Sequence, residues 1–302
     1  MTRRQKSPAS SGKHLTNSRI VASNLRLLQL GDLLAARFEE LKVPYALLKG
    51  AAFVDTIYSD ISTRAMTDVD ILVPFSFQAR AHEICIENGL SFIPPPTNKK
   101  AGWKEHYNWQ YTSSDGALVE IHFALSPKGM FKIDYSALLS RCINYETAAR
   151  NVTTLSPEDT LLALAIHEAK HAYLLSPHSS QDIKRAVEHW PPNWSVVVKR
   201  AGSWGCTSAL YLAFSRALSQ GAAIPQNVIE QLRPGNTKRA ALWMLFGLAS
   251  NAKPRIPSLP TWFKFAATLG VVDGFKQRKD FLAVYTKRRL TDASAALEKK
   301  RN

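Results

Sequence analysis

The first 150 residues alternate between helix-like and strand-like hydrophobic patterns. Leucine and phenylalanine recur at helical spacing over residues 20–41, and a proline follows soon after that stretch. The short apolar runs 45–48 and 67–73 predict buried strands, and a turn with a helix ending at Tyr58 is expected after the first run. Residues 75–88 form an amphipathic pattern that ends at a glycine, as expected of a capped helix.

A hairpin and then a long series of helices are expected in the rest of the chain. Residues 107–112 and 118–125 alternate as strands around the turn sequence Ser113-Ser-Asp-Gly116, which predicts a β-hairpin. Ser156 has the character of an N-cap and Pro157 that of a first helical residue. From there to the C-terminus, helical patterns follow one another and are separated by prolines.

These patterns predict an α+β protein of two domains with different charge. We expect a disordered basic tail over residues 1–19, a domain with a small mixed sheet and flanking helices over 20–150, and an all-helical domain over 151–302. The formal net charge is +15. Residues 20–180 hold 14 Lys/Arg and 17 Asp/Glu, whereas residues 181–302 hold 20 and 7. The basic half predicts an anionic partner, with RNA or DNA among the candidates.

Cysteine and hydropathy patterns bear on the compartment. The three cysteines are scattered and form no CxxC pair, which favours a reducing compartment over a disulfide framework. No apolar run approaches the roughly 18–20 residues that a membrane span needs. We therefore expect a cytoplasmic protein with no membrane partner; its oligomeric state stays open.

Two aspartates at the start of an apolar strand are the strongest sign of chemistry. Asp68 and Asp70 alternate, so they should project from the same face of a strand. Two such charges repel each other unless a cation lies between them, and a divalent metal is the usual cation. Glu120, in the strand-like run 118–125, offers a third carboxylate. With the Lys49-Gly50 turn nearby in sequence, these residues predict a site for Mg²⁺ and a nucleoside triphosphate.

The ordered set of motifs resembles a known superfamily. The turn Lys49-Gly-Ala-Ala52, the sequence Arg64-Ala-Met-Thr-Asp-Val-Asp70, the later Glu120 and the helix His167-Glu-Ala-Lys-His171 occur in that order. This order is similar to that of the nucleotidyltransferases to which DNA polymerase β belongs. The best match is a branch of uncharacterised bacterial nucleotidyltransferases. The resemblance covers about residues 40–190 and implies the polymerase β-like fold for the first domain.

The resemblance also implies roles for individual residues. Asp68, Asp70 and Glu120 would hold two Mg²⁺ ions, with Mn²⁺ as a substitute, and would act in catalysis. The side chains or backbone of Lys49, Gly50 and Arg64 would bind the nucleotide. The candidates on the acceptor side are three histidines: His122, His167 and His171. For His122 an ordinary core position is the interpretation we favour.

Two other functions stay open at this point. Ala51 and Ala52 replace the hydroxyl-bearing residue that binds the terminal phosphate in much of the superfamily. That departure leaves room for a catalytically inactive relative that binds nucleotide or nucleic acid. The sequence His167-Glu168-Ala-Lys-His171 also has the HExxH spacing of zinc peptidases, although it lies at the start of a basic helical region. The transferase is the interpretation we favour.

Overall fold

The computed structural model describes residues 8–94, 107–171, 178–250 and 261–286. The chain divides into two compact units. The first combines residues 1–93, 108–122 and 142–154, and the second combines 94–107, 123–141 and 155–302. The predicted boundary at residue 150 differs from this division, because the chain leaves the first unit after His122 and returns to it at Cys142 before the helical series begins.

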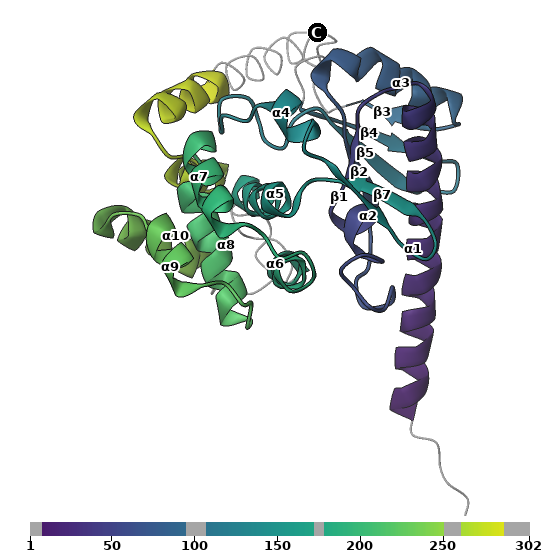
Figure 1. The fold of residues 1–302 in the computed structure, drawn as a ribbon, viewed down its shortest axis with the longest axis horizontal. Helices are drawn as coiled ribbons and strands as arrows, with labels where there is room; N and C mark the ends of the chain where they lie inside the picture. Colours follow the sequence, from purple (N-terminus) through teal and green to yellow (C-terminus); the bar gives the residue numbers. More distant parts are fainter. Residues whose placement is uncertain (1–7, 95–106, 172–177, 251–260, 287–302) are drawn as a thin grey trace, which may run out of the picture. The chain divides into compact units, whose positions relative to one another are not determined.

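A seven-stranded mixed sheet forms the core of the first unit (Figure 1). Its order is β3-β4-β5-β2-β1-β7-β6, with β2 parallel to β5, β1 parallel to β7, and the other neighbours antiparallel. The strands are β1 (Ala46–Leu48), β2 (Asp68–Leu72), β3 (Ser91–Ile93), β4 (Asn108–Thr112), β5 (Leu118–His122), β6 (Ile143–Glu146) and β7 (Asn151–Thr154).

The sequence predicted the centre of this sheet and missed part of its edges. The runs 45–48 and 67–73 and the hairpin are confirmed as β1, β2 and the β4–β5 pair. The strands β3, β6 and β7 were not predicted, because they are only three or four residues long. Such short segments carry too few apolar residues for periodicity to reveal them.

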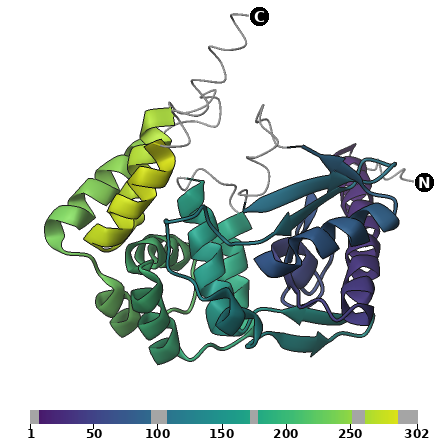
Figure 2. The ribbon, with the colours of Figure 1, turned by 90° about the horizontal axis from the view of Figure 1, so that it is seen from above.

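Helix α1 (Pro8–Glu40) runs along the first unit beside α3 (Gln78–Glu87) (Figures 1 and 2). It includes residues 8–19, which were expected to be a tail. A proline at the first helical position costs nothing, because its missing N–H would have no helical partner there. Gly31 of α1 approaches the sheet so closely that a Cβ there would lie 3.3 Å from Val69 Cγ1. Helix α1 therefore covers the face of the sheet to which Val69 belongs.

Two short helical segments complete the first unit. The helix expected to reach Tyr58 is α2 (Lys49–Phe53) and ends five residues earlier. The amphipathic helix expected over 75–88 begins with a 3₁₀ turn, η1 (Phe75–Phe77), and continues as α3. Gly89 follows α3 with a φ of 77°, as the glycine C-cap signal predicted.

The second unit is a bundle of helices, as predicted for that part of the chain. Ser156 accepts a hydrogen bond from the Asp159 backbone, so the predicted N-cap is confirmed. Helices α5, α6 and α8 pack against one another (Figure 2). The helices are α4 (Tyr135–Leu139), α5 (Pro157–Lys170), α6 (His178–His189), α7 (Trp194–Trp204), α8 (Thr207–Ser219), α9 (Gln226–Leu232), α10 (Asn236–Ser250) and α11 (Thr261–Val271). Within the described ranges, no helix has the length and apolarity that crossing a membrane requires.

Candidate active site

The acidic residues singled out from the sequence lie on the sheet face opposite Val69. Side chains alternate along β2, so Val69 faces α1 while Asp68 and Asp70 point the other way. In the parallel pair of β2 and β5, Asp70 lies opposite Glu120 and Leu72 lies opposite His122. The fold thus brings two of the predicted carboxylates next to each other from positions fifty residues apart.

Asp70 is the most buried carboxylate of this group, with 2% of the residue exposed. Its Oδ1 atom is 2.8 Å from Lys49 Nζ and 2.6 Å from His122 Nε2. Burial by itself raises the pKa of Asp70, but the Lys49 ammonium and the hydrogen bond from His122 outweigh burial and lower it. Asp70 therefore stays ionised at neutral pH despite its burial.

Glu120 is partly buried, and two amides from the neighbouring strand β4 hold its carboxylate. Gln110 Nε2 donates to Oε1 at 2.6 Å, and Asn108 Nδ2 donates to Oε2 at 3.2 Å. His122 Nε2 lies 3.3 Å from Oε2. Burial raises the pKa of Glu120, but hydrogen bonding and charge from His122, together with the Gln110 amide, lower it to about 2. Neither amide was predicted, although the hairpin register places Gln110 directly opposite Glu120.

Asp68 lies at the start of β2 and is less constrained. Thr67 Oγ1 donates to its Oδ1 at 3.0 Å. Burial and the charge of Asp70 raise the pKa of Asp68. The raised pKa reflects the repulsion between Asp68 and Asp70, which a cation at this face would relieve.

Three side chains here are close enough to share one metal ion. Among the described residues, Asp70, Glu120 and His122 each offer a ligand atom, and these atoms lie within 4.8 Å of one another. Two carboxylate oxygens and an imidazole nitrogen suit a divalent cation. The predicted metal set contained Asp68 in place of His122. His122 is 2% exposed, as expected of a core histidine, yet its Nε2 faces the two carboxylates.

The Lys49-Gly50 turn brings a cation to Asp70 and leaves no space for a side chain at Gly50. Lys49 has a φ of 46°, in the left-handed region. A Cβ on Gly50 would lie 2.6 Å from Arg64 Nη1 and 2.9 Å from Met66 Cγ. Helix α2 spans only five residues, so its dipole adds little to anion binding. The turn therefore places the Lys49 charge beside Asp70 and the Arg64 guanidinium beside Gly50.

Arg64 is held in place by a buried asparagine on α1. Asn24 Nδ2 donates to the carbonyl oxygens of Ile61 at 2.7 Å and Arg64 at 2.8 Å, and Asn24 Oδ1 accepts from the Met66 N–H at 2.8 Å. The Arg64 guanidinium lies over the Phe53 ring, 5.9 Å from its centroid. Asn24 has no exposed surface and fixes the loop that precedes β2. Asn24 was not predicted, because a polar residue in an apolar helix pattern gives no sign of its partner.

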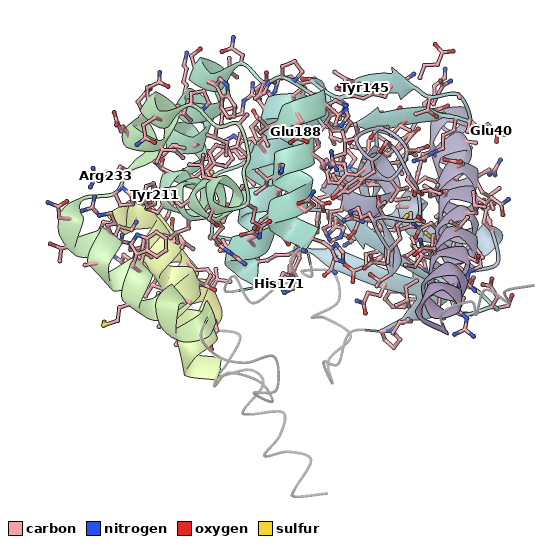
Figure 3. The ribbon with its side chains drawn as sticks, turned by 90° about the horizontal axis from the view of Figure 1, so that it is seen from below. Glu40, Tyr145, His171, Glu188, Tyr211 and Arg233 are labelled. Carbon is pink, nitrogen blue, oxygen red and sulfur yellow. The ribbon has the colours of Figure 1, made fainter. Side chains whose placement is uncertain are left out.

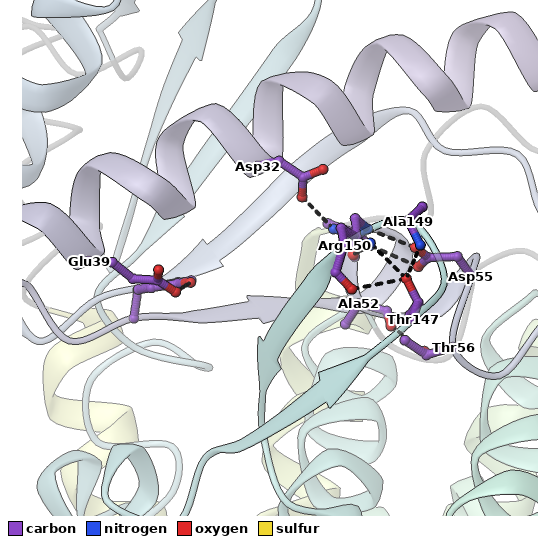
Figure 4. A network of polar contacts seen from close by, with 10 residues as sticks. Asp32, Glu39, Ala52, Asp55, Thr56, Thr147, Ala149 and Arg150 are labelled. Carbon is purple, nitrogen blue, oxygen red and sulfur yellow. Dashed lines mark hydrogen bonds and ion pairs between the residues drawn. The ribbon is translucent and has the colours of Figure 1, made fainter.

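Arg150 joins the other end of the turn to α1 (Figure 4). Its Nε and Nη2 donate to both oxygens of Asp55 at 2.7 and 2.8 Å, and its Nη1 donates to Asp32 Oδ1 at 2.8 Å. Nη2 also donates to the Ala51 carbonyl oxygen. One guanidinium thus links the α2 region, α1 and the start of β7. Nothing in the local sequence around Arg150 indicated this role.

Residues 4–218 match the family described as uncharacterised nucleotidyltransferases, which is more than half of the chain. The chain belongs to this family. It is therefore a nucleotidyltransferase enzyme by family, in agreement with the predicted superfamily. No curated protein is similar enough in sequence to be matched.

Solved structures show only a distant likeness to the chain. The lincosamide adenylyltransferase LnuA with bound lincomycin is 17% identical with a TM-score of 0.34, and the match covers 50% of this chain and 90% of LnuA. The enzyme ANT(2")-Ia in complex with adenylyl-2"-tobramycin is 15% identical with a TM-score of 0.39, covering 63% and 97%. An antigenic nucleotidyltransferase-like protein from Paracoccidioides brasiliensis is 15% identical with a TM-score of 0.36, covering 68% and 91%.

The HExxH-like sequence lies on α5 in the second unit. The rings of His167 and His171 have centroids 4.8 Å apart, and His171 is exposed at the C-terminal end of the helix (Figure 3). Glu168 is fully buried, and its Oε2 accepts from Arg216 Nη1 at 3.2 Å. A carboxylate paired in this way inside the helical bundle is poorly placed to activate water for a peptidase. Among the described residues, the side chains close enough to share a metal ion are instead Asp70, Glu120 and His122, in the sheet of the first unit.

Replacement of Arg150 by methionine should destabilise the protein by about 3 kcal/mol, because it leaves the acids Asp32 and Asp55 without their cation. The measurement is urea unfolding followed by circular dichroism. Arg26→Met is the matched control, because Arg26 is 45% exposed and its pair with Asp115 should contribute no more than about 0.5 kcal/mol. Equal losses in the two variants would contradict the role given to Arg150.

Glu168 should make stability fall as the pH rises. Burial, opposed by the Arg216 charge and reinforced by Asp182, raises the pKa of Glu168 from 4.5 to about 7. Between pH 4.5 and about 7, the folded state therefore keeps a proton on Glu168 that the unfolded state has lost. The free energy of unfolding decreases as the pH rises through this range. We expect wild type to lose about 2–3 kcal/mol more than Glu168→Gln between pH 5 and pH 8 in urea titrations. Parallel profiles for the two proteins would contradict this.

Proposed function

We propose that the protein transfers a nucleoside monophosphate from a nucleoside triphosphate to an acceptor hydroxyl and releases pyrophosphate. The observation that carries the proposal is the meeting of Asp70 and Glu120 on neighbouring parallel strands, with Lys49 bonded to Asp70. This arrangement gathers negative charge for a metal and positive charge for a triphosphate in one place. Family membership supports the reaction class.

The carboxylates would hold a divalent cation, Mg²⁺ or Mn²⁺. When bound, such an ion lowers the pKa of a hydroxyl and neutralises charge on transferring phosphate oxygens. Asp70 and Glu120 are ionised at neutral pH and fixed by their partners, and an ion at Asp70 would share its carboxylate with the Lys49 ammonium or displace it. Asp68, at the open end of the same strand face, would complete the predicted two-ion set. Glu120 is also the carboxylate proposed to accept the proton of the acceptor hydroxyl.

The positive groups of the turn would contact the nucleotide. Lys49 offers a flexible point charge, and Arg64 offers a planar guanidinium beside Gly50. Gly50 lets the Arg64 guanidinium lie against the backbone of the turn, where any side chain would collide with it.

The helical second unit is proposed to select the acceptor. Residues 181–302 hold 20 basic and 7 acidic residues, and such a surface favours a phosphate-bearing acceptor, with RNA or DNA among the candidates. His167 and His171 on α5 remain the candidate contacts for that acceptor. A protein or a small molecule would supply the same reacting group, a hydroxyl.

One observation favours a second candidate function. Ala51 and Ala52 are 1% and 0% exposed, so the turn has no side-chain hydroxyl for a terminal phosphate and no space to admit one easily. An inactive relative that binds nucleotide without transferring it would tolerate this loss. Both candidates would bind nucleotide, but only the transferase would turn it over.

Label transfer from each α-³²P nucleoside triphosphate, with Mg²⁺ or Mn²⁺ and with total RNA and cell extract as acceptor pools, tests the proposal. Asp70→Asn should lower the transfer rate about a thousandfold, because it removes a charge from the metal site. Asp60→Asn, in an exposed loop, is the matched control and should leave the rate unchanged. Nucleotide binding without transfer in wild type would favour the inactive relative. Transfer that persists in Asp70→Asn would overturn the assigned site.

A further inference from the structure

His122 is the buried polar residue of the site for which the proposed function has no role. It is 2% exposed and lies on the same face of β5 as Glu120, two residues away. Its Nε2 atom is 2.6 Å from Asp70 Oδ1 and 3.3 Å from Glu120 Oε2. The nitrogen therefore points at the two carboxylates that the proposed function assigns to the metal.

We propose that His122 Nε2 is a direct ligand of that metal, which makes the centre a mixed nitrogen–oxygen site that prefers Mn²⁺ to Mg²⁺. This inference rests on the proposed function, because it assumes that a cation binds at Asp70 and Glu120. It differs from the all-carboxylate set expected from the sequence by one ligand and by the metal selected.

The two distances from His122 suit ligands in neighbouring positions around one ion. Around an ion with bonds of about 2.1 Å, neighbouring ligand atoms lie about 3 Å apart. The two distances from His122 Nε2, 2.6 and 3.3 Å, lie on either side of that value. All three ligand atoms lie within 4.8 Å of one another, so a single ion can reach them with small side-chain rotations.

A hydrogen-bonding role alone accounts less well for this geometry. One imidazole Nε2 carries at most one proton, and the 2.6 Å contact with Asp70 takes most of it, so the 3.3 Å contact with Glu120 is left weakly satisfied. A cation satisfies all three atoms at once. Binding requires the neutral imidazole with its proton on Nδ1, which is the ordinary form of a histidine that ligates a metal.

Paired strands and neighbouring amides hold the three ligands in fixed positions. Asp70 and His122 lie on paired strands in the interior of the sheet, and Gln110 and Asn108 fix the Glu120 carboxylate from β4. Ligands on rigid strands, with further hydrogen bonds behind them, hold a metal geometry better than ligands on loops. To admit the ion, the Lys49 ammonium, 2.8 Å from Asp70 Oδ1, would have to make room.

The nitrogen ligand determines which metal is favoured. Mg²⁺ binds almost entirely to oxygen and gains little from an imidazole, whereas transition-metal dications gain affinity from nitrogen. Mn²⁺ shares the octahedral oxygen chemistry of Mg²⁺ and also accepts an imidazole. The set of two carboxylates and one histidine therefore favours Mn²⁺ while it retains the charge that phosphoryl transfer needs.

The test is pulsed EPR on Mn²⁺ bound to the full chain without a polyhistidine tag. Electron spin echo modulation should show coupling to a directly bound ¹⁴N, and this pattern should change to that of ¹⁵N when the protein is made with ¹⁵N-labelled histidine. The labelling experiment uses wild type, so it does not depend on a variant that folds. Mn²⁺ affinity follows from the continuous-wave signal of the free ion.

Two variants locate the nitrogen and measure selectivity. His122→Gln should abolish the nitrogen coupling and reduce the preference for Mn²⁺ over Mg²⁺ about tenfold, as competition between the two ions measures. His189→Gln, at the exposed end of α6, should behave as wild type. Bound Mn²⁺ without nitrogen coupling, or coupling that persists in His122→Gln, would overturn this proposal alone. Failure of wild type to bind Mn²⁺ would overturn it together with the metal site of the proposed function.

Discussion

The buried charge of Asp70 is the constraint on which the site depends. Removing a carboxylate from water costs several kcal/mol unless fixed partners replace the solvent. Lys49 and His122 are those partners, at 2.8 and 2.6 Å from the same oxygen. One partner comes from the turn after β1 and the other from β5. The charge of Asp70 is therefore tolerated only while β2 stays in register between its two neighbours.

A second layer of polar contacts holds the groups that face Asp70. Asn24 ties the loop of Arg64 to α1, and Arg150 ties the Ala51 end of the turn to α1 and β7. Both residues use α1 as the common support. Because Gly31 lets α1 lie close against Val69, the same helix covers one face of the sheet and leaves the opposite face to the carboxylates. Packing of α1 on one face of the sheet thus leaves the other face to the carboxylates.

Local patterns in the sequence predicted the parts of the site that lie on a single strand or turn. Alternation placed Asp68 and Asp70 on one face, and the hairpin signal placed Glu120 on a neighbouring strand. The contacts of Arg150 depend on pairing between distant segments, which periodicity does not encode, whereas the Gln110 amide follows from the register of the predicted hairpin. His122 shows most clearly what local sequence patterns could not predict. Its burial was expected, but only the register of β2 with β5 brings its nitrogen to Asp70.

Asp70 and Glu120 are proposed to hold a divalent cation beside a nucleotide. The most direct measurement is a crystal structure of the protein grown with Mn²⁺ and a non-hydrolysable nucleoside triphosphate, with anomalous data collected for manganese. The account predicts an anomalous peak within about 2.2 Å of a carboxylate oxygen of each residue, with the triphosphate beside Lys49. A bound nucleotide with manganese at another place would contradict this prediction. So would a bound nucleotide with Asp70 still paired with Lys49 and with no metal.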